Sequence, residues 1–164
     1  MSASHEPLKA KPFELFALEI QAFLGLHRTA SLATVDGLGV PHAANIQYAH
    51  EDHGTLWWVS SPQSQHSQNL AANPQAAITV YAPNQVPEAI HGVQCRGRLA
   101  TVLAPGDSQY AAALKHYLAT FAFAGHPPFE AALAKQSLYC FKPSWLRWID
   151  NRRGFGWNVE KTLA

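Results

Sequence analysis

The chain has 164 residues, a formal net charge of +1 and no long uninterrupted apolar segment. A chain of this length fits one domain with a sizeable core, and the balanced charge argues against a nucleic-acid partner or a tail that grips a membrane. Because no segment approaches the roughly 20 apolar residues of a membrane span and the N-terminus lacks a signal-peptide pattern, we expect a cytoplasmic protein with a small-molecule partner.

The first part of the chain predicts an arm, a helix and three strands. Residues 1–12 hold two prolines and no periodicity, which predicts a loose arm. Apolar residues then recur at helical spacing from Phe13 to Leu26. Short β-favouring runs follow at residues 30–35, 40–49 and 56–59, separated by polar turns. The region therefore predicts one amphipathic helix followed by antiparallel strands.

The stretch from Trp57 to Pro74 combines an apolar strand, a polar turn and a helix start. Ser60, Ser61 and Ser64 are all favourable N-cap residues, and Pro62 fits the first helical position. Free N–H groups and the positive end of a helix dipole, surrounded by hydroxyls, are typical of a phosphate site. Polar residues at helix starts also often serve only as caps, so both interpretations stay open.

The second part of the chain predicts more strands and two further helices. After a helix over residues 64–72, alternating patterns predict strands over 76–81 and 90–102, the second long enough to curl around a barrel. The predicted elements that follow are helices from 107 to about 118 and over 129–135, and strands over 137–141 and 145–149 interrupted by Pro143. Residues 150–157 are predicted to close the ordered part of the chain as a turn-rich tail. Successive strands with short turns and few helices indicate a closed antiparallel barrel flanked by helices.

The cysteines and histidines give little support for a metal site. Cys95 and Cys140 lie in strand-like sequence without a Cys-x-x-Cys neighbour, which predicts two buried thiols and no disulfide scaffold. His50 and His53 lie in a polar turn, where solvated side chains are the ordinary case. We predict no metal site from these residues.

Three sequence blocks, in this order and spacing, resemble a known superfamily. They are Ser31 to Asp36 followed by Gly39 to His42; Val59-Ser60 through Asn69-Leu70 and Asn73-Pro74; and Gly92 to Gly97. Together they resemble the FMN-binding split-barrel superfamily of pyridoxamine 5'-phosphate oxidase, and the tail from Trp148 to Gly156 resembles small, poorly characterised bacterial members. The resemblance covers roughly Phe23 to Trp157. It implies a mainly β fold with flanking helices, an antiparallel split β-barrel over residues 13–160.

The resemblance also implies FMN in a groove between two subunits of a homodimer. The positions that match cofactor-contacting residues are Ala44, Asn45, Ile46 and Gln47 in a strand; Ser60 and Ser61 after the third strand; Ser64, Gln65 and His66 in the phosphate segment; and Gln94, which matches a glutamine that reaches the flavin ring. Trp157 and Arg147 in the tail are candidates for contacts across the subunit interface.

Two departures from the oxidase bear on function. Gln65 and His66 stand where the oxidase has adjacent Arg and Lys, so hydroxyls, helix N–H groups, protonated His66 or an arginine from elsewhere must replace two cations. The arginines available for this are Arg96, Arg98, Arg152 and Arg153. The oxidase's C-terminal Arg-x-His substrate motif is absent, which argues against pyridoxamine phosphate oxidation.

These observations favour an FMN-binding protein, in the first place a flavin-dependent oxidoreductase acting on a small molecule. The cofactor would supply the redox chemistry, and the residues define no protein acid, base or nucleophile. One alternative is a non-enzymatic carrier or sensor that holds flavin or haem, with His42, His66 and His91 as possible axial ligands. Another is a cofactor-free dimeric module, which the missing Arg and Lys favour.

Overall fold

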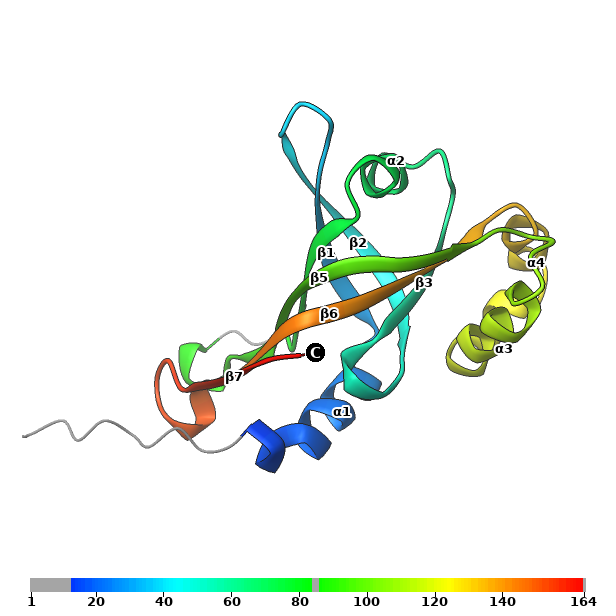
Figure 1. Ribbon diagram of the computed structural model, residues 1–164. Helices are drawn as coiled ribbons and strands as arrows, with labels where there is room; N and C mark the ends of the chain where they lie inside the picture. Colours follow the sequence, from blue (N-terminus) through cyan, green and yellow to red (C-terminus); the bar gives the residue numbers. More distant parts are fainter. Residues whose placement is uncertain (1–12, 84–85, 164) are drawn as a thin grey trace, which may run out of the picture.

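The computed structural model describes residues 13–83 and 86–163, and the predicted loose arm over residues 1–12 lies outside this part (Figure 1). The strands are β1 (Thr29–Val35), β2 (Pro41–His50), β3 (Leu56–Ser60), β4 (Gln75–Tyr81), β5 (His91–Leu103), β6 (Ser137–Asp150) and β7 (Asn158–Thr162). The helices are α1 (Ala17–Leu26), α2 (Gln65–Ala72), α3 (Tyr110–Thr120) and α4 (Phe129–Leu133). Short 3-10 turns are η1 (Phe13–Phe16), η2 (Asp52–Gly54), η3 (Pro87–Ala89), η4 (Ala122–Gly125) and η5 (Asn151–Arg153).

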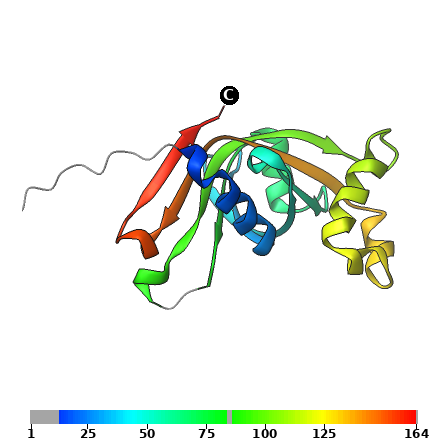
Figure 2. The same cartoon turned by 90° about the horizontal axis from the view of Figure 1, so that it is seen from below.

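Six strands close into an antiparallel barrel. The sheet order is β3-β2-β1-β4-β5-β6-β7, and β3 also pairs with β6, so β1 to β6 form a ring with β7 outside it. The helices lie around this ring, with α1 across one end and α3 and α4 to one side (Figure 2). The predicted fold, mainly β with flanking helices and a split antiparallel barrel, is confirmed.

The barrel is split between β2 and β3. These strands pair only from Tyr48 to His50 on β2, opposite Leu56 to Trp58 on β3. Further along, β2 stays paired with β1, whereas the end of β3 pairs with β6. Helix α2 follows β3 and contacts both β1 and β2, so it covers the barrel where the two strands diverge. The split therefore brings α2 beside β1 and β2.

Large apolar side chains fill the barrel, as the alternating strand patterns predict. Trp58, Trp148 and Tyr48 are almost completely buried, and Phe23 of α1 closes one end of the core by packing on Trp148 with ring centroids 5.0 Å apart. The tyrosine hydroxyl donates to the carbonyl oxygens of Leu24 and of the residue that follows α1. The helix predicted from Phe13 to Leu26 is present, with its first turn as the 3-10 turn η1.

The predicted interruption of the last long strand is wrong. Pro143 lies inside β6, which runs unbroken from Ser137 to Asp150. The pairing of β5 with β6 shifts register between Arg96 and Gly97, and this bulge lets a residue without an N–H remain in the ladder. Gly97 is required there, because a Cβ atom on it would lie 2.1 Å from the carbonyl oxygen of Lys142.

Two other sequence expectations have clear outcomes. The tail does not end the ordered structure, because β7 follows it and pairs with β6 from Trp145 to Ile149. Cys95 and Cys140 are both free and buried, as predicted. Burial raises the pKa of Cys95 to about 12 and that of Cys140 to about 11, so both behave as small apolar groups. Within the described ranges, no helix is long and apolar enough to span a bilayer.

Candidate functional site

A cluster of hydroxyls and one imidazole surrounds the N-terminus of α2. Ser60 ends β3, and its Oγ lies 2.7 Å from Nε2 of His66 and 3.2 Å from Oγ of Ser64. Ser64 is the N-cap, because its Oγ accepts a hydrogen bond from the backbone N–H of Ser67. The predicted helix over 64–72 is confirmed, with Ser64 and not Ser60 or Ser61 as its cap. Pro62 lies in the turn before the helix and not at its first position.

The first turn of α2 leaves backbone donors free. Gln65 and His66 precede the first intrahelical hydrogen bond, and no acceptor for their N–H groups occurs in the described part of the chain. These donors and the helix dipole favour an anion at this end of the helix. The hydroxyls of Ser60 and Ser64 lie beside the same end, so the cluster has the composition of a phosphate seat without a fixed cation.

His66 is neutral at neutral pH in this cluster. Burial lowers the pKa of His66 below its ordinary value. The hydroxyl of Ser64 donates to Oγ of Ser67. A consistent set of donors therefore runs from Nε2–H of His66 to Ser60 and from Ser60 to Ser64, which assigns the imidazole proton to Nε2. His66 can thus donate a hydrogen bond from the atom nearest the hydroxyls.

The other polar residues of this segment hold the helix in place. Gln65 donates from its side chain to Oδ1 of Asn69 at 2.8 Å, and Asn69 in turn donates to Oγ1 of Thr34 on β1 at 3.0 Å. Asn69 is 3% exposed and Thr34 is 2% exposed, so this bond is inside the protein. Ser61 donates to the side chain of Gln63 within the turn. The polar groups of Gln65 and Ser61 are therefore used in local hydrogen bonds and are not free to bind a ligand at the cluster.

The predicted strand residues Ala44 to Gln47 lie along the split in the barrel. On one side they pair with Leu32 to Thr29 of β1. On the other side, no described strand pairs with them, because β3 leaves β2 beyond Tyr48. Asn45 and Gln47 are exposed, Ala44 is half-buried, and Ile46 is 6% exposed and belongs to the core. This edge of β2 offers backbone N–H and C=O groups to a ligand.

Gln94 lies on the outer face of the barrel, the side of the sheet that points away from the core. The strand registers place Asn45, Ser31, Thr79, Gln94 and Arg147 in one row across five strands. Gln94 is three strand spacings from Asn45, or about 14 Å at the usual spacing. The row joins two of the predicted cofactor residues, but in a single chain it keeps them well apart.

Trp157 lies far from the serine cluster within one chain. Its ring packs on Phe16 with centroids 5.0 Å apart, beside β7 at the end of β6. Ser60 pairs with Ser137 at the beginning of β6, whereas Trp148 pairs with β7 eleven residues later (148 − 137 = 11). Strand geometry places these points roughly 30 Å or more apart along β6. Trp157 and Ser60 can serve one ligand only if they come from different subunits.

The arginines that were candidates for the phosphate mostly have other partners. Asp150, almost completely buried, accepts hydrogen bonds from Arg152 and Arg153, and Arg153 also pairs with Glu19 of α1 at 2.7 Å. The Arg96 guanidinium lies 4.7 Å from the ring centroid of Trp145. Arg98, the fourth candidate, is exposed with no ion pair in the described residues. Arg147, the candidate for a contact across the subunit interface, pairs with Glu160.

All three candidate axial histidines have partners, and those of His66 are the hydroxyls of Ser60 and Ser64. Nε2 of His42 lies 3.1 Å from a carboxylate oxygen of Asp36, and Nδ1 of His91 lies 2.8 Å from the carbonyl oxygen of Ala89. The ring of His91 packs among aromatic side chains of the core, 5.3 Å from Phe23. In the described ranges, no group of three or more His, Cys, Asp or Glu side chains has the geometry of a metal site.

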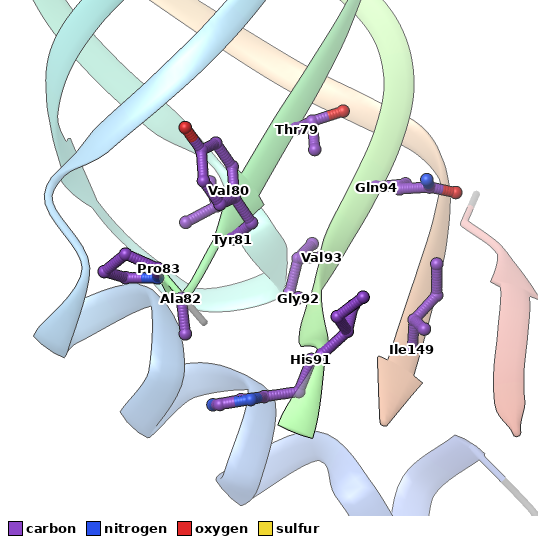
Figure 3. Close-up of a pocket in the computed structure, with 11 residues that line it drawn as sticks. Thr79, Val80, Tyr81, Ala82, Pro83, His91, Gly92, Val93, Gln94 and Ile149 are labelled. Atoms are coloured by element: carbon purple, nitrogen blue, oxygen red, sulfur yellow. The ribbon is translucent and has the colours of Figure 1, made fainter. Parts of the chain in front are cut away.

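A cavity on the outer face was not predicted from the sequence. It has a volume of about 560 Å³ and lies over Gly92, between Tyr81 on β4 and Ile149 on β6 (Figure 3). Thr79 and Gln94 lie at one end of it. The sequence signal for it is limited to a glycine, Gly92, within a long predicted strand. The cavity exists because Gly92, which has no side chain, lies between Tyr81 and Ile149 in one row across three strands.

Comparison with known proteins identifies the family. A family model described as pyridoxamine 5'-phosphate oxidase matches residues 16–149, most of the chain. The chain therefore belongs to the pyridoxamine 5'-phosphate oxidase family. No curated protein matches the sequence significantly.

Solved structures with the same fold have different described roles. A haem-binding protein from Mycobacterium smegmatis has 25% identity and a TM-score of 0.67, covering 89% of this chain and 56% of that chain. The haem storage protein HutZ from Vibrio cholerae has 20% identity and a TM-score of 0.59, covering 77% and 88%. An F420 reductase has 24% identity and a TM-score of 0.60, covering 77% and 94%. The chain thus spans just over half of the Mycobacterium smegmatis protein, and the other two similarities concern the fold.

Proposed function

We propose that the chain binds FMN with its phosphate at the N-terminus of α2. The observation that carries the proposal is the convergence of Ser60, Ser64, the Nε2–H of His66 and two free backbone N–H groups at one helix end. All of these groups donate hydrogen bonds, which is the chemistry a phosphate requires. Membership of the pyridoxamine 5'-phosphate oxidase family supports FMN as the phosphate ester.

The flavin ring is proposed to lie along the free edge of β2. Helix α2 contacts β2, the strand whose free edge carries Ala44 to Gln47, so a molecule anchored at the helix start is proposed to extend along this edge. The free backbone N–H and C=O groups of this β2 edge can hydrogen-bond to the polar edge of a flavin ring. Gln94 and Trp157 are too far away in the same chain. We propose that a second copy supplies them, in a homodimer with the cofactor at the subunit interface.

The proposed activity is that of a flavin-dependent oxidoreductase acting on a small molecule. Bound FMN would supply the electron transfer, and the protein would bind it, orient it and exclude water around the ring. The described side chains near the seat are hydroxyls, amides and one imidazole, so no carboxylate or thiol nucleophile is assigned a role. The absence of the oxidase's Arg-x-His motif argues that the substrate is not pyridoxamine phosphate.

The absorbance spectrum of the purified protein tests this proposal. We expect two flavin bands, either as isolated or after addition of FMN and removal of the excess. The double variant Ser64→Ala with His66→Ala should bind FMN more weakly, whereas Ser61→Ala should bind it normally because that hydroxyl is used within the turn. A featureless spectrum that FMN does not change would exclude the flavin function.

Haem is the second candidate, since the Mycobacterium smegmatis structure is described as haem-binding. In this chain His42 pairs with the Asp36 carboxylate and Nδ1 of His91 bonds to the Ala89 carbonyl, whereas the partners of His66 are serine hydroxyls, so His66 is the proposed ligand. A Soret band that persists after gel filtration and disappears in His66→Ala would favour haem. The same spectrum therefore separates the two cofactors.

A further inference from the structure

The cavity over Gly92 has the shape of a slot with apolar walls. The registers place Tyr81, Gly92 and Ile149 in one row on neighbouring strands, so the two side chains flank a position that has none (Figure 3). The outer Cα atoms of this row are about 10 Å apart, at twice the strand spacing. The Tyr81 and Ile149 side chains take up part of this width, and the space that remains between them accepts a flat molecule.

The floor of the slot is held open by the strand pairing. A Cβ atom at Gly92 would lie 2.5 Å from the carbonyl oxygen of Val80, so no other residue fits without a shift of β4. The walls are unusually exposed for apolar side chains, with Tyr81 60% exposed and Ile90 46% exposed. A ligand in the slot would remove this apolar surface from water.

Two uncharged polar side chains, Thr79 and Gln94, lie at one end of the slot, and the imidazole of His91 lines it as well. Thr79 and Gln94 face each other across β4 and β5, and neither side chain has a hydrogen-bond partner in the described part of the protein. Of the residues that line the cavity, none is Asp, Glu, Lys or Arg. An anionic ligand would lose its hydration there without gaining a cation, which is costly. The slot therefore favours a molecule without charge.

We propose that this slot binds a planar, uncharged aromatic molecule whose polar edge is recognised by Thr79 and Gln94. Its identification as the substrate rests on the proposed flavin function, in which Gln94 of one subunit approaches the ring held by the other. The binding itself does not depend on FMN. This substrate belongs to a chemical class unlike a phosphate ester, because neither Lys nor Arg is among the residues that line the slot.

Two fluorescent probes with the same ring system test the charge preference. N-phenyl-1-naphthylamine is uncharged, and 8-anilino-1-naphthalenesulfonate carries a sulfonate on the same rings. With the flavin-free protein, we expect saturable binding of the neutral probe and at least about tenfold weaker binding of the sulfonate. Equal or tighter binding of the sulfonate would overturn the proposal.

Matched variants locate the binding. Ile90→Trp, just before β5, should fill the slot and weaken binding of the neutral probe about tenfold or more. Val102→Trp places the same ring at a similarly exposed position near the far end of β5 and should have no effect. Tyr81→Ala should weaken binding by removing one wall, and thermal unfolding checks that all three variants fold. A probe affinity that Ile90→Trp and Tyr81→Ala leave unchanged would overturn the assignment.

A competition experiment separates this inference from the proposed function. FMN should bind without displacing the neutral probe, because the ring is proposed to lie along β2 and not in the slot. Displacement of the probe by FMN would show that the slot belongs to the cofactor and would overturn the substrate assignment. Failure to bind FMN, with probe binding intact, would instead count against the flavin function alone.

Discussion

Ser60 Oγ and His66 Nε2, 2.7 Å apart, join the end of β3 to the first turn of α2. The contact places the one titratable side chain of the proposed phosphate seat next to its hydroxyls. Because burial lowers the pKa of His66, the free protein has a neutral imidazole there. A phosphate dianion beside it favours the protonated form and raises its pKa in the complex.

FMN binding should therefore take up a proton. Between the pKa of His66 in the free protein and its higher pKa in the complex, affinity for FMN should increase as the pH falls from about 8 to about 5.5. Riboflavin, which has no phosphate, should show no such dependence. Flavin fluorescence quenching measures both. His66→Gln should flatten the FMN profile, and an unchanged slope in that variant would place the phosphate elsewhere.

The tie between α2 and β1 predicts a structural requirement for the seat. Asn69→Ala removes a buried hydrogen bond to Thr34 and should cost about 1–3 kcal/mol in the free energy of unfolding. FMN affinity should fall as well, because the helix start loses its anchor. Gln68→Ala on the exposed side of the same helix removes only an exposed hydrogen bond to the Gln63 carbonyl and should cost less than about 1 kcal/mol, with little effect on FMN affinity. Equal urea midpoints for the two variants would contradict this view.

The buried carboxylate of Asp150 should stabilise the tail. Burial acts to raise its pKa, but the hydrogen bonds and charge of Arg152 prevail, and the net pKa is lowered. Asp150→Asn leaves Arg152 and Arg153 without that charge and should reduce the free energy of unfolding by about 2–3 kcal/mol. Glu160→Gln breaks an exposed pair with Arg147 and should cost less than about 1 kcal/mol. Urea unfolding compares the two.

Close packing of β5 on β6 makes one glycine irreplaceable. Gly97→Ala would bring a Cβ atom against the Lys142 carbonyl and should cost about 3 kcal/mol or more, because the backbone must move. Gly37→Ala meets nothing within 4 Å and should be nearly neutral. Thermal unfolding temperature and soluble yield measure the difference. Similar stability of both variants would mean that the bulge adapts easily.

Buried histidines should make the protein less stable in acid. Burial is the main cause that lowers the pKa of His27, His50 and His66 below 6.5. The unfolded chain then binds more protons than the folded protein as the pH falls below that value, so folding stability decreases there. Unfolding temperatures at about pH 8 and about pH 5.5 test this, and His50→Gln should reduce the difference. A flat profile down to about pH 5 would contradict the expectation.

Most strands and helices were predictable because they follow from local patterns. The alternation in β5 placed Gln94 and Arg96 opposite Val93 and Cys95, as the structure has them. The continuous strand through Pro143 was not predictable, since it depends on a bulge at Ser144 of the same strand, opposite Arg96 and Gly97 of β5. The strand β7 was missed because its five residues are mostly exposed and lack the alternation of a half-buried strand.

The seat at α2 was predictable in composition and less so in detail. Ser64 as cap follows from helix-start preferences, whereas the turn of Gln65 towards Asn69 depends on the contact of Asn69 with β1. Arg152 and Arg153 both pair with Glu19, which lies more than 130 residues earlier in the chain, so no local pattern predicts these ion pairs. The cavity over Gly92 needed the alignment of three strands, which no local pattern contains.

The pairing that closes the barrel also dictates an order of assembly. Ser60 on β3 pairs with Ser137 on β6, 77 residues later (137 − 60 = 77), so the ring cannot close until most of the chain has been synthesised. Until then, β3 has only its short pairing with β2, and β5 lacks its neighbour on one side. Contacts this distant in sequence slow folding. The barrel should therefore form late on the ribosome, with two strand edges exposed until β6 emerges.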